Sequence, residues 1–584
     1  FCIQHSGENL RCFGTLKSEN NSFPQARPMY PERKRFRIIR IRNNSAITLK
    51  LDNLTGPLQL KSLYIRRISA FKAWHKITKR CKKLVGRHSF AQKSDLWRLY
   101  NRIQLSQRVN SFLFSYAQWR KSVEIPIQRR LGNVKNYAPN IVEFINTESL
   151  ARATSAQFVV PYFLTDKFSE YLLPILILAI KQSPNVKVFY GDNDNVSRDD
   201  VRENPCFRPA WNRELFWSSS SYAHAWVIDS DTWNLAYERL LVSEPGFSFN
   251  RLLLEILHDT ETFFGVNAIA HIPHILCSIS WSSFKHYSSC NYLNQAKLDL
   301  QKFFQAHIDY YYQFEDALLN PAGTGFTLQW AMPRQSLLSI CIPTRDSLPI
   351  LDNCIQSIYS HNPGIPIELI VIDNGSSCPD TLKFLDMFDS LAGPNQTRQH
   401  VLRAPGPFNY SRLNNLAFKE CRGDTILLLN NDTEFIEDGW AYKLSSNALR
   451  PGIGCVGAKL LFPDDTIQHA GVVLGIGGVA GHAFKYYDSS LSETGYCGRL
   501  QLAQEYSAVT AACLAISSEN WIKLGGLDET NLAVNYNDVD LCLRAFSHGL
   551  RNVYLPDVVV YHHESKTRGK PSGLAYDQWK REKS

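Results

Sequence analysis

Three ligand-type side chains, Asn430, Asn431 and Asp432, directly follow the apolar run of residues 426–429. A short apolar run between polar residues is typical of a strand buried on both faces, as in a parallel sheet covered by helices. In open α/β sheets, ligands bind at the edge formed by the carboxyl ends of the strands. A carboxylate at that edge can hold a divalent cation, which can in turn hold phosphates. The same pattern also fits a strand that simply ends in a polar turn.

Two earlier apolar runs, residues 337–342 and 367–372, read as strands of the same sheet, and a helical pattern follows each of them. This alternation predicts an α/β, doubly wound sheet with right-handed crossovers. The first turn lacks Gly-x-Gly-x-x-Gly, which argues against a dinucleotide cofactor. Asp373 ends the second of these strands, where it can accept hydrogen bonds from a ribose or a base, or cap the next turn.

Acids and imidazoles recur further along the chain. Asp538 and Asp540 fall in the first turn of a predicted helix, where the helix dipole alone favours acids. His562 and His563 follow the strand-like residues 553–560. Adjacent residues of a strand point to opposite faces, so one histidine of this pair could reach a metal ion. A single histidine there is also compatible with a structural role.

The composition indicates a globular protein. The chain has 584 residues, of which 44% are hydrophobic and 20% charged, which excludes a disordered or membrane-embedded class. The net charge of +10 favours anionic partners. The 14 cysteines form no Cys-x-x-Cys pair, which is neither a zinc-ribbon pattern nor a disulfide framework and predicts a reducing cytoplasm. The most apolar segment, residues 171–180, is too short to span a bilayer.

The first 135 residues are predicted to form a basic region with β and amphipathic helical segments. Residues 1–28 read as a loose tail and residues 38–51 alternate as a strand does. Residues 58–84 combine apolar residues at helical spacing with lysine and arginine, so they could lie on an acidic membrane surface, on the inner face of the cytoplasmic membrane. The alternative is a helix packed on the next domain. No nucleic-acid-binding motif accompanies the charge, so nucleic acid is not expected as a partner.

Three further parts are expected: residues 136–290, a helical linker over 291–335, and a last domain over 336–584. Asn320 and Pro321 break the helical pattern of residues 291–320 and mark the boundary. In the middle part, residues 158–163 read as a strand, 168–181 as a helix and 186–190 as a strand. The last of these precedes Asp192 and Asp194, for which we expect a loop role rather than a metal site.

The motifs of the last domain are more specific together than alone. They are Pro343-Thr344-Arg345-Asp346, Asp373-Asn374-Gly375-Ser376, Asn430-Asn431-Asp432-Thr433-Glu434, Ala508-Val509-Thr510-Ala511-Ala512, Gly525-Gly526-Leu527-Asp528-Glu529, Asn537-Asp538-Val539-Asp540 and Tyr561-His562-His563-Glu564. In this order they resemble a family 2 glycosyltransferase with the GT-A fold, over about residues 325–575. The likeness is greatest to the branch that builds O-antigen and other surface polysaccharides, often called rhamnosyltransferase-like.

The resemblance implies transfer of a sugar, possibly from dTDP-rhamnose, to a polysaccharide or lipid-linked glycan with inversion at the anomeric carbon. Asp538 then matches the general base, and Asp432 the last acid of the Asp-x-Asp motif that binds Mg²⁺ or Mn²⁺. His562 or His563 would complete the shell of that ion. The alternative is a non-catalytic scaffold of a polysaccharide assembly complex. The residues that the resemblance assigns to the nucleotide are Pro343, Thr344, Arg345, Asp373 and Asn430.

Two residues depart from the family pattern: Asn430 stands where the first acid of Asp-x-Asp is usual, and Asn537 where a glutamate usually precedes the base. The middle part resembles the later half of a second GT-A domain. Counting from shared motifs places the counterpart of Asp432 at Asp166 and those of the histidines at Ile279 and Ser280. The counterpart of the base falls on Glu255 or Arg251. We therefore expect a degenerate, non-catalytic partner domain.

Overall fold

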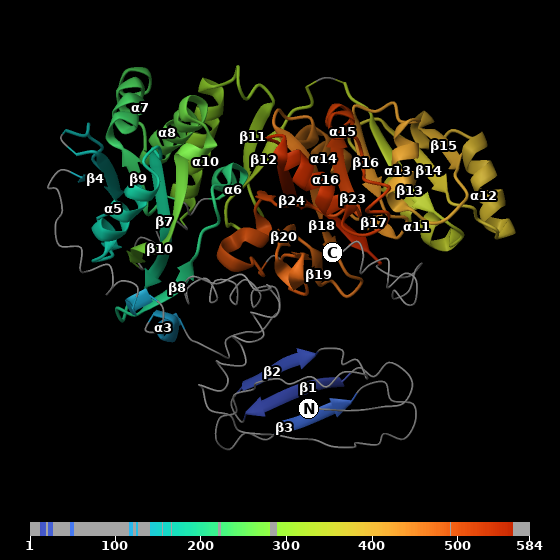
Figure 1. Cartoon of the computed structure of the whole chain (residues 1–584), viewed down its shortest axis with the longest axis horizontal. Helices are drawn as coiled ribbons and strands as arrows, with labels where there is room; N and C mark the ends of the chain where they lie inside the picture. The colour runs from blue at the N-terminus through green and yellow to red at the C-terminus, as the bar shows by residue number, and fades with distance from the viewer. Residues whose placement is uncertain are drawn as a thin grey trace. The chain divides into compact units, whose positions relative to one another are not determined.

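The computed structural model describes residues 12–18, 21–26, 47–51, 116–120, 124–126 and 141–563, apart from residues 155, 165, 220–222, 281–288, 334 and 491. The chain divides into two compact units, residues 1–101 with 109–115, and residues 102–108 with 116–584. In the first unit, β1 (Cys12–Ser18) pairs antiparallel with β2 (Asn21–Ala26) and β3 (Ile47–Leu51) (Figure 1). The predicted loose tail is therefore wrong for residues 12–18 and 21–26, and the basic helix expected over 58–84 lies outside the described residues.

The C-terminal part of the second unit is built on a ten-stranded sheet. Its main path runs in the order β15 (Arg398–Arg403), β14 (Ile367–Asp373), β13 (Leu338–Thr344), β16 (Thr425–Leu429), β23 (Cys513–Ser517), β18 (Ile453–Leu461), β24 (Arg551–His562) and β17 (Thr433–Phe435). The first four strands are parallel, and β23 is antiparallel to both of its neighbours. Strand β18 is parallel to β24, and β17 closes this path antiparallel to β24.

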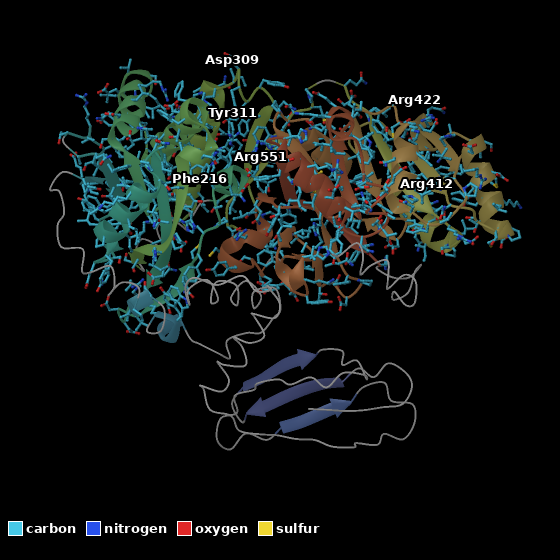
Figure 2. All side chains as sticks on the ribbon, viewed as in Figure 1. Phe216, Asp309, Tyr311, Arg412, Arg422 and Arg551 are labelled. Atoms are coloured by element: carbon cyan, nitrogen blue, oxygen red, sulfur yellow. The ribbon has the colours of Figure 1, made fainter. Side chains whose placement is uncertain are left out.

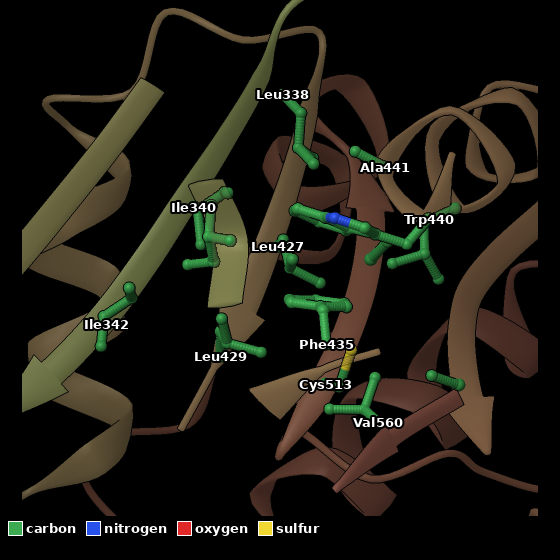
Figure 3. Close-up of a cluster of buried hydrophobic side chains, with 14 of the residues drawn as sticks. Leu338, Ile340, Ile342, Leu427, Leu429, Phe435, Trp440, Ala441, Cys513 and Val560 are labelled. Carbon is green, nitrogen blue, oxygen red and sulfur yellow. The ribbon is translucent and has the colours of Figure 1, made fainter. Parts of the chain in front are cut away.

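Helices bury both faces of this sheet, which explains why its strands read as unbroken apolar runs. Leu427 and Leu429 belong to the core cluster that also contains residues of α11 (Leu348–Ser360), α12 (Pro379–Ser390) and α14 (Trp440–Ala448). Phe435 and Trp440 stack within this cluster (Figure 3). The alternate residues Ile426 and Leu428 belong to the opposite cluster, which contains residues of the other three helices. These are α13 (Tyr410–Phe418), α15 (Ser518–Leu524) and α16 (Asn537–Ser547).

A second sheet occupies the middle part of the chain, and it repeats the later part of the first. Its order is β4 (Val142–Asn146), β5 (Phe158–Tyr162), β9 (Trp226–Asp229), β7 (Val188–Val196), β10 (Ile269–Ser280) and β6 (Lys167–Phe168), with β8 (Arg202–Cys206) beside β7. These six strands have the same chain order, neighbours and directions as β13, β16, β23, β18, β24 and β17. Counterparts of β14 and β15 are not among its described strands.

Several expected elements of the middle part differ from the structure. Asp192 and Asp194 lie inside β7 rather than in a loop after it. The helix expected over residues 168–181 is α5 (Leu172–Gln182). The helical pattern over residues 291–320 corresponds to α10 (Cys290–Ala306), which ends early because a hairpin of β11 (Phe314–Leu319) and β12 (Phe326–Trp330) follows it. The aromatic core of α10 and this hairpin also includes Trp217 and Leu254, so the predicted linker packs on the middle part.

A buried ionic cluster joins the two sheets of the second unit. Glu214 of α6 (Arg213–Ser218) contacts Arg450 at 2.7 Å and Arg551 at 2.7 Å (Figure 2 labels Arg551). Arg450 also lies over the ring of Trp330, 3.7 Å from its centroid. Glu505 of the C-terminal part accepts a further hydrogen bond from Arg551. In the described part of the chain, no helix combines the length and apolarity needed to cross a membrane.

Candidate active site

The carboxyl edge of the C-terminal sheet collects the polar residues that the sequence placed at strand ends. Thr344, the last residue of β13, lies opposite Asp373, the last residue of β14. Strand β16 runs parallel to β13, so Asn430 and Asn431 emerge at the same edge. The side-chain amide of Asn431 donates to Oγ1 of Thr344 at 3.0 Å. Parallel pairing thus brings residues nearly 90 positions apart into direct contact.

Asp432 and His562 form the contact at the centre of this edge. Strand β17 begins directly after Asp432 and pairs with β24, which places Thr433 opposite His562. Oδ1 of Asp432 lies 3.1 Å from Nε2 of His562, and both side chains are buried. Nδ2 of Asn430 lies 3.1 Å from the same ring nitrogen. The strand pairing therefore gathers one carboxylate, one imidazole and one amide around a single point.

The other ring nitrogen of His562 determines what this point can bind. Gln468, on β19 (Ile467–His469), donates its amide to the backbone carbonyl of His562 at 3.3 Å. Its Oε1 therefore faces Nδ1 of His562, at 2.6 Å, as an acceptor, which places the ring proton on Nδ1. Nε2 then presents a lone pair to the amide of Asn430 and lies beside the carboxylate of Asp432, so nitrogen and oxygen lone pairs meet where a cation would be favoured. Metal-binding histidines commonly show this arrangement, with the far nitrogen bonded to a polar partner.

His563 faces the opposite side of the strand, as alternation requires. Its Nε2 lies 2.9 Å from Oε1 of Glu434, and its backbone N–H donates to the carbonyl of Asp432. A small cleft beside it is lined by Asp432, Glu434, His563 and residues of α11. Of the two histidines, His562 is therefore the one whose ring contacts the Asp432 carboxylate in the structure.

Asp538 is the second residue of α16 and lies beside the loop that leads into β23. Its Oδ2 accepts from the backbone N–H of Ala511 at 3.1 Å, and its Oδ1 accepts from that of Val539 at 2.8 Å. Burial raises the pKa of this carboxyl, and the backbone hydrogen bonds only partly oppose the rise. Asp540 pairs with Arg544 one turn along the helix, at 2.7 Å, so it has a structural partner of its own.

A single backbone hydrogen bond links the surroundings of the two carboxylates. The N–H of Asn430 donates to the carbonyl of Ala512 at 3.0 Å. The adjacent residue, Ala511, donates its N–H to the carboxylate of Asp538. The hydroxyl of Tyr410 holds the same loop by donating to the carbonyl of Ala511 at 2.7 Å. Asp432 and Asp538 therefore lie at one sheet edge, each within a few bonds of this junction.

The nucleotide-side residues predicted from the sequence lie across the first two strands. Pro343 and Thr344 are buried and Arg345 is exposed. Asp373 is buried; it accepts from the N–H of Ser376 at 2.8 Å and pairs with Arg403 at 2.9 Å.

Three contacts at this edge were not identified from the sequence. Asn431 binds Thr344, Arg403 pairs with Asp373, and Gln468 binds His562. Arg403 ends β15, whose polar composition gave no strand pattern. Gln468 belongs to a three-residue strand, too short for periodicity to reveal.

The middle part keeps an aspartate at the position of Asp432 but has other residue types at the positions of His562 and Asp538. Asp166 directly precedes β6 as Asp432 precedes β17, but the residue opposite the first position of β6 is Ser278. The motif count of Ile279 and Ser280 was therefore displaced by one position. The second residue of α8 (Phe249–Phe264) is Asn250, where α16 has Asp538.

Glu255, the residue that an ungapped count aligned with the base, has a structural environment. It pairs with Arg239 at 2.5 Å, with Arg251 at 2.5 Å and with His307 at 3.0 Å, and its side chain is buried. These three partners use its carboxylate as the centre of a buried ion network.

Comparison with known proteins gives a family. Residues 339–482 match the model described as glycosyl transferase family 2. The uncharacterized protein y4gI of Sinorhizobium fredii is 37% identical over 409 residues, which cover 68% of this chain and 43% of that protein. The O-antigen biosynthesis protein RfbC of Myxococcus xanthus is 30% identical over 416 residues, covering 71% of this chain and 31% of that protein. The chain thus spans less than half the length of either relative.

Two solved structures are similar to parts of this chain. One is GalNAc-T7 with UDP, GalNAc and Mn²⁺, at a TM-score of 0.35 and 13% identity, covering 49% of this chain and 56% of that chain. Another is the mannosyltransferase PcManGT from Pyrobaculum calidifontis with GDP-Man and Mn²⁺, at a TM-score of 0.30 and 14% identity, covering 47% and 68%.

The α/β sheet with one inserted antiparallel strand and a polar carboxyl edge is the GT-A fold that the sequence motifs predicted. The match to the glycosyl transferase family 2 model lies within this C-terminal part of the chain, over residues 339–482. The family expected from the sequence is thereby confirmed.

Proposed function

We propose that this chain transfers a sugar from a nucleotide diphosphate to an acceptor hydroxyl, with inversion at the anomeric carbon. The observation that supports this proposal is the position of Asp432 and Asp538 on either side of the Ala512–Asn430 hydrogen bond. Inversion in one displacement needs a base for the acceptor proton and stabilisation of the leaving diphosphate. Two carboxylates at one sheet edge can serve these two needs.

Asp538 would act as the general base. Its carboxylate would accept the proton of the acceptor hydroxyl as the new glycosidic bond forms, an effect worth roughly 10²–10⁴-fold in rate. The N–H groups of Ala511 and Val539 fix its orientation. Because burial raises its pKa, the ionised carboxylate is a stronger base than an exposed aspartate.

Asp432 and His562 would hold a divalent cation, Mg²⁺ or Mn²⁺, with His563 at the neighbouring cleft. The donor set fits, since a carboxylate oxygen and an imidazole lone pair face each other and Gln468 fixes the tautomer. When bound, such an ion neutralises charge on the diphosphate. Asn430 replaces one acid of the usual motif, so this chain offers one carboxylate fewer to the ion.

The nucleotide would bind over β13 and β14. Thr344 and Asp373 are held in place by Asn431, Ser376 and Arg403. The exposed guanidinium of Arg345 is suited to bidentate contact with a phosphate. The other residues proposed for this role are Pro343 and Asn430.

The acceptor would be a surface polysaccharide or a lipid-linked glycan. The name of the RfbC relative, an O-antigen biosynthesis protein, supports this class. A deoxyhexose nucleotide such as dTDP-rhamnose is the donor we would test first, followed by hexose and galactofuranose nucleotides.

A donor screen followed by one substitution tests the function. Thermal shift with Mn²⁺ across nucleotide sugars identifies the donor, and transfer is then assayed with Asp538→Asn. We expect at least about a 100-fold loss of transfer with donor binding retained. The control is Asp540→Asn, whose carboxylate pairs with Arg544 and lies outside the proposed chemistry.

Two results would contradict the proposal in different ways. Transfer by Asp538→Asn at the wild-type rate would refute the base assignment. Wild-type protein that binds a nucleotide sugar or glycan but turns over none would favour the non-catalytic scaffold.

A further inference from the structure

The middle sheet retains a cluster of metal-ligand side chains at the place that corresponds to Asp432. Asp166 directly precedes β6, and β6 pairs antiparallel with β10 as β17 does with β24. Cys277 of β10 lies opposite Phe168 of β6. His224 comes from the loop before β9, at the same distance from its strand as Ala511 from β23. Three separate segments thus converge at the carboxyl edge of a second half-sheet.

The donor atoms of this cluster are close enough to share one ion. One oxygen of Asp166, one ring nitrogen of His224 and the sulfur of Cys277 lie within 4.8 Å of one another, the sole such group of three found among the described residues. Nδ1 of His224 lies 2.8 Å from Oδ2 of Asp166. All three side chains are at most 2% exposed.

The carboxylate of Asp166 has an unmet requirement. Its Oδ1 is buried and has no hydrogen-bond partner among the residues that the structure describes. A buried polar atom without a partner is unfavourable by about 1–3 kcal/mol, and more when it is charged. Oδ1 of Asp194, also buried, is in the same state, and this acid acts electrostatically on Cys277. Two buried carboxylate oxygens without a hydrogen-bond donor create a local environment that favours a cation.

Two arginines lie near the cluster, and the charge of Arg208 acts on Cys277. Arg208 donates to the backbone carbonyl of His224 at 2.9 Å and to the side chain of Asn193 at 3.1 Å. Arg202 pairs with Asp194 at 2.6 Å. The carboxylate of Asp166 contacts the ring of His224, whose Nδ1 lies 2.8 Å from its Oδ2.

We propose that Asp166, His224 and Cys277 bind a transition-metal ion of the zinc type. A thiolate, an imidazole and a carboxylate together suit Zn²⁺. They do not suit Mg²⁺ or Ca²⁺, which prefer oxygen ligands. The Asp432–His562 site offers only oxygen and nitrogen donors, so the two sites differ in kind. The buried ion would tie β6, β10 and the loop before β9 together. This inference does not rest on the proposed glycosyl transfer.

Binding has a chemical consequence at Cys277. Burial raises the pKa of its thiol, and the nearby Asp166 carboxylate adds to the rise. A metal ion that bound there would have to displace the thiol proton to solvent, as metal–thiolate bonds require. The product is a neutralised carboxylate and a metal-bound sulfur in place of S–H.

Cobalt substitution tests this site in the full chain. Chelator-treated protein is titrated with Co²⁺, which gives near-ultraviolet thiolate-to-cobalt absorption only when sulfur is a ligand. We expect one equivalent of this absorption in the wild type and in Asp432→Asn, and its displacement by Zn²⁺. Cys277→Ser should abolish it, while Cys455→Ser, a buried cysteine of β18, should keep it.

Two outcomes would overturn the proposal. One is wild-type protein that shows no such absorption at saturating Co²⁺, which would leave the cluster a hydrogen-bonded triad. The other is absorption that persists in Cys277→Ser. Because the first outcome is read on the unmodified protein, a variant that folds poorly does not rescue the proposal. His224→Gln provides a second ligand variant.

Discussion

Asp538 has an environment that makes its titration measurable. Burial raises the pKa of its carboxyl, and the base must be ionised to accept a proton. We therefore expect the transfer rate to fall as the pH decreases through this raised pKa, with the acidic limb above the value of about 4 for an ordinary aspartate. The measurement is kcat/KM against pH for the wild type and for Asp538→Glu. An acidic limb that stays in place when the side chain at 538 changes would show that another group titrates.

The stability of Asp538→Asn provides the control for that profile. An acid whose folded pKa is raised favours folding when protonated, and this benefit disappears as the pH rises through its unfolded pKa towards its folded pKa. At neutral pH the ionised carboxylate therefore opposes folding, so asparagine should leave the melting temperature equal or higher. A large decrease would mean that the carboxylate holds the loop of Ala511 rather than serving the reaction.

Gln468 is expected to act through His562 as a positioning residue. Its Oε1 accepts a hydrogen bond from Nδ1–H of His562 and so keeps the Nε2 lone pair towards Asp432. Gln468→Leu removes this acceptor and should weaken Mn²⁺ binding by about 10–100-fold, the usual effect of losing such a partner. Gln468→Glu retains an acceptor and should retain most of the affinity. Equal Mn²⁺ affinities of the two variants in a titration would contradict this role.

The acids of the candidate site could be located from the sequence because the signal that marks them is local. Asp432 and Asp373 end contiguous apolar runs, so their positions at strand ends can be read without knowing the fold. The partners that orient them cannot be read in this way. Arg403 reaches Asp373 from β15 and Gln468 reaches His562 from β19, and both contacts depend on strand order rather than on spacing.

At the scale of elements, Glu368 links neighbouring segments at the amino edge of the C-terminal sheet. This buried residue of β14 accepts from the backbone N–H of Arg422 at 2.6 Å and from Arg398 of β15 at 2.7 Å, and Ser339 of β13 also donates to it. Glu368→Gln weakens several charge-assisted bonds, so we expect a loss of about 1.5–3 kcal/mol in the free energy of unfolding. Urea denaturation measures it.

The matched control for Glu368 is Glu420→Gln. The side chain of Glu420 is 43% exposed, and its carboxylate approaches His400 at 4.0 Å. Surface substitutions of this kind change the free energy of unfolding by about 0.5 kcal/mol or less. If the two variants were equally stable, the network around Glu368 would contribute nothing specific.

Helices with a clear apolar stripe were predicted well and short polar strands were not. Helix α11 has the predicted bounds of 348–360, because its apolar residues recur at helical spacing up to the end. Strand β15 reads Arg-Gln-His-Val-Leu-Arg, and only pairing with β14 makes it a strand. The segment after Ala306 was predicted helical, yet the hairpin of β11 and β12 forms there because its aromatic residues pack against α10.

For the whole molecule, a substitution at Glu214 tests how the two sheets are held together, and its expected effect on stability is large. Burial raises the pKa of Glu214, but the charges and hydrogen bonds of Arg450 and Arg551 outweigh this and lower the pKa to about 2. Glu214→Gln leaves two arginines without their carboxylate, so we expect a loss of about 3–5 kcal/mol in the free energy of unfolding. Glu238→Gln, in an exposed pair with Arg152, should lose at most about 1 kcal/mol.

The pH dependence of stability gives an independent reading of the same cluster. A folded pKa below the unfolded value of 4.5 means that the Glu214 contribution is complete above about pH 4.5 and disappears as the pH falls towards about 2. The wild type should therefore lose stability over this window more steeply than Glu214→Gln. Parallel acid-unfolding curves for the two proteins would contradict the ionic account.

The repeated half-sheet sets an upper limit on ligand stoichiometry. Strands β14 and β15, which form the wing beside β13 that carries Asp373, have no counterparts among the described strands of the middle sheet. A duplicated catalytic module would saturate with two equivalents of nucleotide per polypeptide. This chain should saturate with one, and isothermal calorimetry with a nucleoside diphosphate would count them directly.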